Sequence, residues 1–222
     1  DQPENWGRLG VPLGKSDKPG DRHIFPTYEG EEPDDPELLD MFSRTSGACL
    51  AETDADDLAA EKIEYLLAQG FARAFDSLRQ LRRHLRQRPV VSDLIVITKT
   101  TAEGVKKRII IDLKRSGVSR SSFKSERVML PRALDLVWDI LDTLADADTD
   151  EVEGEPTHII LDFMDAFFQV PIRPSERRFA VVRHRNRYIL FYRAPQGSRG
   201  APLLWARVVA LLCRLTVALT DP

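Results

Sequence analysis

The sequence predicts an α+β fold, because helical and extended patterns occupy separate segments along the chain. Apolar residues recur at helical spacing in residues 56–70, 132–144 and 201–219. Two pairs of β-branched runs, within residues 93–117 and 177–192, each flank a short polar turn, which is typical of hairpins. The chain has 222 residues, of which 42% are hydrophobic and 30% charged, so it can bury a sizeable core.

Residues 1–55 differ in composition from the rest of the chain. Six of the 14 prolines occur there, among glycines and acidic residues, and no helical or strand period is sustained. We therefore expect an acidic, proline-rich linker or arm that is poorly ordered. The folded part is assigned to residues 56–222.

No secretory leader is recognisable after the first residue, which is an aspartate. The two cysteines, Cys49 and Cys213, lie far apart and fit neither a disulfide framework nor a zinc site. These features leave the compartment unknown and favour an intracellular location, cytoplasmic or nuclear, over secretion.

The first two helices are predicted by their start and stop signals. Asp56 or Asp57 can cap the first, and Gly70 ends it. The residues of its apolar face are Ala59, Ile63, Leu66 and Leu67. The second begins with the capping box of Ser77 and Gln80 and ends before Pro89; its apolar stripe is Leu78, Leu81 and Leu85. Its other faces carry arginines that are either solvated or directed at phosphates, namely Arg79, Arg82, Arg83 and Arg86.

Charge is distributed unevenly along the chain, although the net charge is only −3. Residues 1–69 hold 6 lysines and arginines against 17 acidic residues, whereas residues 73–127 hold 15 against 5. The basic block includes the tip of the hairpin in residues 93–117. It indicates a polyanionic partner, and the alternative is a solvated basic surface beside an acidic arm.

The second half of the chain contains two further predicted helices, with an acidic loop between them. An apolar face behind Pro131 predicts the helix at 132–144, and an acidic loop follows it. That loop resembles a calcium loop only in part, because Glu151 and Thr157 replace the required glycine and glutamate, so we expect a solvated loop. The last helix, 201–219, is apolar enough for a membrane span, but Arg207 and Arg214 would share one face in the bilayer, so we expect no membrane contact.

Two carboxylates, Asp162 and Asp165, stand in the apolar stretch LDFMDAFFQVPI at residues 161–172. Asp162 ends a predicted strand at residues 157–162, where an unpaired carboxylate must be solvated or neutralised by a cation. Asp165 suits the N-cap of one helical turn before Pro171. We therefore interpret Asp162 as a candidate metal ligand and Asp165 as a cap.

Three motifs resemble those of reverse transcriptases of the retrotransposon and retroviral type, and they follow one another along the chain in the order expected for that family. The stretch 161–172 resembles the segment with the first catalytic aspartate, and APQGSRGAP at 194–202 resembles the P-Q-G segment beside the incoming nucleotide. KKRIIIDLKRSG at 106–117 resembles the fingers hairpin, in which an arginine four residues before an aspartate reaches the triphosphate. Those residues are Arg108 and Asp112, which also fit a surface ion pair of little energetic value. The resemblance runs from about residue 56 to 222 and implies the fingers and part of the palm of a right-hand polymerase.

The resemblance implies nucleotidyl transfer from a deoxynucleoside triphosphate (dNTP) to the 3′-hydroxyl of a primer on an RNA or DNA template. It assigns Asp162 as the catalytic carboxylate that binds Mg²⁺, or alternatively Mn²⁺, with the backbone carbonyl of Phe163 as a second ligand. Lys99 and Arg108 would neutralise the triphosphate, although Lys106 competes for the place of the lysine. Asp165 and Ala166 would present backbone amides to phosphate at a helix N-terminus. The remaining nucleotide contacts would come from Phe167, Gln196 and Gly197.

Simpler interpretations exist for these last three residues. Phe167 would lie under the sugar, where a large ring favours deoxynucleotides, but Phe167 and Phe168 also fit a role as core aromatics. Gln196 and Gly197 also fit an ordinary turn before the last helix, with Ser198 as its N-cap.

The chain departs from the family pattern after residue 202, where no Y-x-D-D motif with the other catalytic carboxylates occurs. The adjacent pairs Asp34–Asp35 and Asp56–Asp57 precede the fingers hairpin and are poor substitutes. We therefore expect a fragment of a retroelement polyprotein that does not polymerise by itself. The alternatives are a non-catalytic nucleic-acid-binding remnant and a protein-interaction module that uses the apolar last helix.

Overall fold

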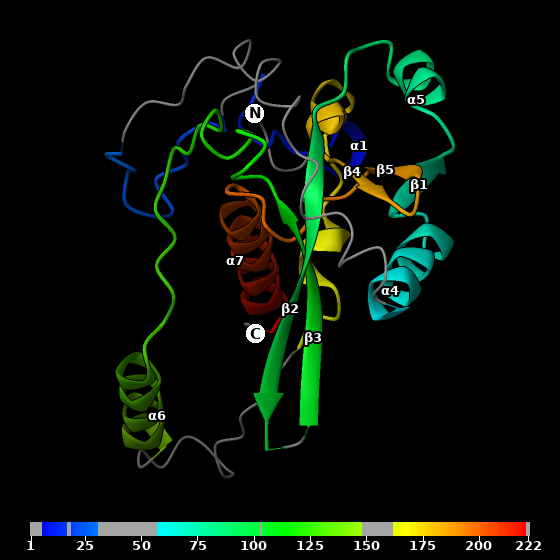
Figure 1. Ribbon diagram of the computed structural model, residues 1–222. Coiled ribbons are helices and arrows are strands. Elements are labelled where there is room, and N and C mark those ends of the chain that lie inside the picture. Colours follow the sequence, from blue (N-terminus) through cyan, green and yellow to red (C-terminus); the bar gives the residue numbers. More distant parts are fainter. Residues whose placement is uncertain (1–5, 17–18, 31–56, 103, 148–161, 221–222) are drawn as a thin grey trace.

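Strands and helices are interspersed in the computed structural model, which describes residues 6–16, 19–30, 57–102, 104–147 and 162–220 (Figure 1). These residues form a mixed five-stranded sheet with helices around it, which confirms the α+β class. In chain order the elements are α1 (Trp6–Leu9), α4 (Asp57–Ala68), β1 (Ala72–Phe75), α5 (Leu78–Leu85), β2 (Val91–Thr101), β3 (Gly104–Asp112), α6 (Ala133–Ala147), the 3₁₀ turns η3 (Ala166–Gln169) and η4 (Pro174–Phe179), β4 (Val181–His184), β5 (Arg187–Phe191) and α7 (Ala201–Thr220).

The sheet has the order β1-β5-β4-β2-β3. Neighbouring strands are antiparallel except β2 and β4, which pair in parallel through Val91 with Val181 and Ser92 with Val182. The β2–β3 hairpin, predicted within residues 93–117, is confirmed, and its register runs from Asp93 opposite Asp112 to the hairpin tip. In Figure 1 this long hairpin extends well beyond the shorter strands of the sheet.

The second predicted hairpin is confirmed only for β4 and β5. Arg185 and Asn186 form its turn with positive φ angles, as two-residue hairpin turns require. Residues 177–179, which the sequence predicted to be extended, belong instead to η4. Pro174 explains this difference, because its fixed φ favours the first position of a helical turn.

The predicted helix at 56–70 is α4, and its apolar face packs into the core. Ala59, Ile63 and Leu66 are buried there, Leu67 is partly buried, and Gly70 follows the helix with φ of 69°. The short helix α5 is also confirmed: the amide of Gln80 donates to Oγ of Ser77 at 3.3 Å.

The N-terminal segment is better ordered than its composition predicts. Trp6, Val11 and Leu13 are buried in the main core. The Val11 amide donates to the carbonyl oxygen of Pro171 at 2.7 Å, and Val11 in turn accepts from the amide of Arg173 at 3.0 Å. The expectation of a poorly ordered arm is therefore wrong for residues 6–16. Three apolar side chains and these backbone hydrogen bonds hold the segment, a contribution that proline content does not reveal.

Both long helices predicted in the second half are present. In Figure 1, α6 lies apart from the sheet at the end of an extended segment. Its apolar side chains are exposed, namely Leu134, Leu136, Val137, Trp138, Leu141 and Leu144. The first half of α7 packs against the core, whereas residues 211–219 are exposed. Ala201–Leu219 is long and apolar enough to span a membrane by length and composition. The strand predicted at 157–162 and the acidic loop before it fall almost wholly outside the described residues.

Candidate functional site

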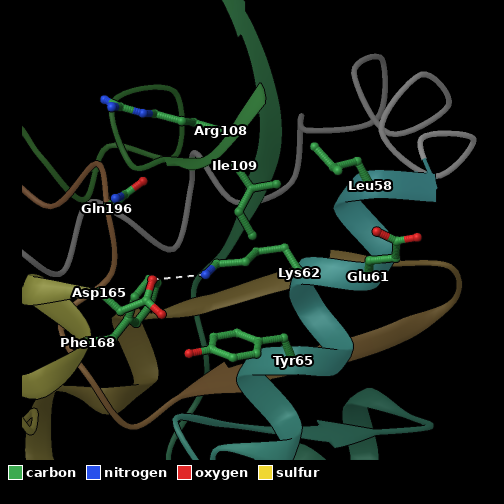
Figure 2. A pocket seen from close by; sticks show the side chains of 9 residues that line it. All are labelled: Leu58, Glu61, Lys62, Tyr65, Arg108, Ile109, Asp165, Phe168 and Gln196. Carbon is green, nitrogen blue, oxygen red and sulfur yellow. Dashed lines mark hydrogen bonds and ion pairs between the residues drawn. The ribbon is translucent and has the colours of Figure 1, made fainter. Parts of the chain in front are cut away.

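A cavity of about 490 Å³ lies where α4, β3, the turn at η3 and the segment before α7 meet (Figure 2). It is lined by Leu58, Glu61, Lys62, Tyr65, Arg108, Ile109, Asp165, Phe168 and Gln196. From three separate motifs, the resemblance predicts that Arg108, Asp165 and Gln196 bind nucleotide. The fold brings these three to one cavity, although they lie far apart in the sequence.

The P-Q-G segment is held directly against β3. The amide of Ile111 donates to the carbonyl oxygen of Gln196 at 3.1 Å. Gly197 has φ of 101°, and a Cβ at this position would clash with the carbonyl oxygen of Ile111. Only glycine tolerates both the conformation and this close approach. The carbonyl oxygen of Ser198 then accepts the amide of Ala201 at 3.2 Å, so the segment is also a turn before a helix.

Arg108 stands on β3 opposite Ile97 and is exposed at the cavity. The carboxylate of Asp112 is engaged with the turn that follows the strand. Its Oδ1 accepts the backbone amides of Lys114 at 3.1 Å and Arg115 at 2.9 Å. Asp112 therefore has a structural role at the end of β3, and the place of Arg108 follows from the register of the strand.

Asp165 occupies the N-cap position of η3, which confirms the predicted helical turn, but its side chain does not cap it. Its φ of 52° and ψ of 39° are left-handed, whereas a side-chain cap requires an extended residue. The carboxylate binds Lys62 of α4 instead, with Nζ and Oδ1 2.9 Å apart. The interpretation of the Asp165 side chain as a cap is thus wrong, and its proposed role through backbone amides is a separate prediction.

Lys62 and Tyr65, one helical turn apart on α4, surround the carboxylate of Asp165. The ammonium of Lys62 lies 4.3 Å from the centre of the Tyr65 ring. The pKa of the Tyr65 phenol is raised above its ordinary value, chiefly by the neighbouring carboxylate of Asp165 and to a lesser degree by burial. Figure 2 shows both side chains directed from α4 towards Asp165.

Sequence reasoning did not select Lys62 or Tyr65, because the helix was interpreted only by its apolar face. One signal was present in the sequence: Lys62 is the only basic residue between Arg44 and Arg73, in an otherwise acidic region. Such an isolated cation on a core helix suggests a specific anionic partner, which the structure identifies as Asp165.

The aromatic residues of the stretch 161–172 divide into core and surface. Phe168 is buried and stacks between Phe71 and Phe191, at 6.1 Å from each ring. Phe167 is partly buried against the same core and does not belong to the cavity lining. Phe163 is 41% exposed, and its ring makes a T-shaped contact with that of Trp205, with the ring centroids 5.2 Å apart. Phe168 rather than Phe167 thus reaches the cavity.

The remaining predicted residues lie outside the cavity lining. Lys99 is exposed on β2, and it lies opposite Lys106 in the register of the hairpin. Asp162 is exposed and Ala166 is partly buried in the first position of η3.

The metal site predicted at Asp162 and Phe163 is incomplete. Within the ranges that the structure describes, no three histidine, cysteine or acidic side chains lie close enough to hold a metal ion. Asp162 and one carbonyl oxygen are a poor donor set for Mg²⁺, which requires near-octahedral oxygen coordination. The described residues therefore do not fit this ion on their own.

A second hollow, of about 580 Å³, lies at the end of α5 and is lined by Arg82, Arg86, Gln87 and Arg88. Arg79 and Arg83 are also exposed on this helix. We refer to Arg79, Arg82, Arg83, Arg86 and Arg88 as the α5 arginine cluster. Because guanidinium groups bind phosphates through two nitrogen atoms at once, such a cluster can hold a polyanion.

The cavity combines two cations, two carboxylates, a phenol and an amide, a set that can bind a ligand carrying both phosphates and hydrogen-bonding groups. Neither the models of known protein families nor the curated protein sequences include a match to this chain.

Proposed function

We propose that the chain is the fingers and partial palm of an RNA-directed DNA polymerase of a retroelement, and that the cavity binds the incoming dNTP. The observation that carries this proposal is the convergence of Arg108, Asp165 and Gln196 on one cavity. Each residue comes from a different motif of the resemblance. A chance likeness of three short motifs would not require their residues to meet in space.

In this proposal each residue has one task. Arg108 neutralises the triphosphate, and Lys99 of the same hairpin is the second proposed cation. Asp165 and Ala166 contribute backbone amides at the start of η3. The remaining contact, to the base or sugar, comes from Gln196, while Phe167 and Gly197, which the resemblance also implies, are neighbours in sequence of the lining residues Phe168 and Gln196.

Magnesium would activate the primer hydroxyl and stabilise the leaving pyrophosphate. Asp162 and the carbonyl oxygen of Phe163 are the proposed ligands from this chain, and further carboxylates must complete the site. Residues 203–222 contain no Y-x-D-D motif that would supply them. We therefore propose that these 222 residues bind nucleotide but do not extend a primer by themselves, and act as part of a longer polyprotein.

The second partner we propose is a template–primer duplex, bound by the basic block of residues 73–127. The α5 arginine cluster lies in this block, and its side chains are exposed. Contacts to phosphates are independent of base sequence and weaken steeply with salt, because counterions are released on binding. Nucleic-acid binding by this chain is thus expected to be non-specific.

A non-catalytic nucleic-acid-binding remnant is the second candidate function. The incomplete donor set around Asp162 favours it, whereas the lined cavity favours the enzyme. A third candidate, a protein-interaction module, draws on the exposed apolar side chains of α6 and of the end of α7. It predicts oligomers that are insensitive to salt and nucleic acid.

Titration calorimetry with dGTP and Mg²⁺ tests the proposed function. The chain should bind dGTP, and Arg108→Ala should weaken binding by about tenfold or more, since it removes a charge-assisted hydrogen bond. Arg127→Ala, another exposed arginine in the basic block, is the matched control and should bind normally. Nucleic-acid binding without any dGTP binding would favour the remnant.

A further inference from the structure

The ion pair between Lys62 and Asp165 belongs to the cavity lining and is open to solvent mainly at Lys62. The Lys62 side chain is 36% exposed and that of Asp165 is 13% exposed. Because Lys62 reaches solvent, the attraction is partly screened and contributes less to folding stability than it would in a completely buried pair. Its place in the cavity lining therefore calls for another explanation.

The carboxylate of Asp165 poses an electrostatic difficulty for a site that binds polyphosphate. It belongs to the cavity lining at the start of η3, and Glu61 adds a second negative charge to that lining. Like charges a few ångströms apart repel strongly where solvent is partly excluded. Arg108 alone would leave the cavity with an excess of negative charge.

Lys62 supplies a second positive charge directly beside Asp165. Its Nζ is 2.9 Å from Oδ1 of Asp165, whereas Glu61 is exposed and directed away from Asp165 (Figure 2). With Lys62 present, the lining holds two positive and two negative side chains. The ring of Tyr65 lies beside the ammonium, and its side chain is directed towards the same carboxylate (Figure 2).

We propose that Lys62 is a charge-compensating positioning residue, which holds and neutralises the carboxylate of Asp165 so that a nucleoside triphosphate can bind beside Arg108. This inference rests on the proposed function, because it presumes that the cavity takes a polyphosphate. The Tyr65 ring assists by holding the ammonium of Lys62 beside the carboxylate. The phosphates themselves are bound by Arg108.

A double-mutant cycle on the full chain tests this role, with dGTP and Mg²⁺ in calorimetry and inorganic triphosphate as a second probe. Lys62→Met should weaken the binding of both ligands by about tenfold, because Asp165 is left uncompensated. Lys62→Met combined with Asp165→Asn should return to within about threefold of the wild-type chain, because the charge to be compensated is gone. Lys62→Arg should bind almost normally.

Lys124→Met is the matched control, since Lys124 also lies over a tyrosine ring, that of Tyr28, at 5.3 Å, outside the cavity. Lys124→Met should leave the binding of dGTP and of inorganic triphosphate unchanged. Circular dichroism melting of each variant shows whether it remains folded, and a melting temperature close to that of the wild-type chain is expected for Lys62→Met.

The outcomes separate the two proposals. If the wild-type chain binds neither ligand, the proposed function fails and this inference fails with it. If the wild-type chain binds and Lys62→Met binds equally well, only the role of Lys62 is overturned. If the double variant stays as weak as Lys62→Met, Lys62 contacts phosphate directly and charge compensation is rejected.

Discussion

Arg207 of α7 and Glu126 form an ion pair with a nitrogen–oxygen distance of 2.7 Å, and both side chains are completely buried. The pair also binds the backbone of residues 20–24. Arg207 donates to the carbonyl oxygen of Gly20 at 2.6 Å, and Glu126 accepts the backbone amides of Arg22 and Ile24 at 3.0 and 3.2 Å. Three segments distant in the sequence thus meet at one buried charge pair.

Removal of one member of this pair is expected to destabilise the fold severely. Arg207→Met leaves the Glu126 carboxylate buried without its cation, and such a change lowers the free energy of unfolding by about 3 to 5 kcal/mol. Urea denaturation followed by circular dichroism measures the change. Arg214→Met, on the exposed part of the same helix, is the control and should change stability by less than about 0.5 kcal/mol. A small effect of Arg207→Met would show that the pair contributes little to the fold.

The close approach of Gly197 to β3 predicts that this glycine cannot be replaced. Gly197→Ala places a Cβ against the carbonyl oxygen of Ile111 and strains a positive φ, at a cost of about 1 to 3 kcal/mol. Dissociation of the segment from β3 would also displace Gln196, so dGTP binding should weaken. Gly7→Ala, where a Cβ meets nothing within 4 Å, should be stable and bind normally. Unchanged binding in a destabilised Gly197→Ala chain would separate the segment from the nucleotide site.

The helices and the first hairpin were predictable because their signals are local: Ser77 with Gln80 marks the start of α5, and a helical period marks α4. The convergence of Arg108 and Gln196 was predictable only through the resemblance, since no local pattern places them together. Lys62 escaped prediction because an ion pair with Asp165 depends on how α4 packs against η3. The docking of Trp6 and Val11 escaped for the same reason: a few long-range contacts outweigh a composition typical of linkers.

The carboxylate of Asp165 beside Tyr65 predicts an unusual phenol titration. A neighbouring carboxylate favours the protonated phenol, so Tyr65 should ionise above the ordinary tyrosine pKa of about 10. The protonated form is the one favoured in the folded chain. The stabilising contribution is therefore complete below the ordinary pKa and is lost as the pH rises through the raised one.

Ultraviolet absorbance titration of the wild-type chain against Tyr65→Phe isolates this phenol from the other three tyrosines. Asp165→Asn should return the titration of Tyr65 to the ordinary range. A normal pKa in the wild-type chain would mean that the phenol does not interact with the carboxylate in solution.

We expect the α5 arginine cluster to contribute part of the affinity for nucleic acid. Arg82→Gln combined with Arg86→Gln should weaken binding to a primed RNA template and reduce the slope of log K against log salt by about 0.9 for each phosphate that is no longer neutralised. Arg8→Gln with Arg214→Gln removes the same charge from exposed positions elsewhere. Fluorescence anisotropy at several salt concentrations measures both pairs. Equal weakening by the two pairs would indicate general electrostatics rather than a binding surface.

Primer extension is the assay in which we expect the isolated chain to be inactive. The described residues include no group of three side chains that could hold a metal ion, and residues 203–222 contain no Y-x-D-D motif. One aspartate and one carbonyl oxygen cannot fix both ions of an in-line transfer. The chain, with dNTPs and either Mg²⁺ or Mn²⁺, should therefore yield no extended product on primed RNA or DNA, even where it binds dGTP.

The control for primer extension is the same chain with Asp162→Asn. Template-directed synthesis by the wild-type chain that disappears in this variant would contradict the expectation and would mean that Asp162 has carboxylate partners within these 222 residues. Synthesis that persists in Asp162→Asn would point to a contaminating polymerase. Absence of product from a chain that binds dGTP through Arg108 would separate nucleotide recognition from metal-dependent transfer, as expected if the described residues supply the first but not the second.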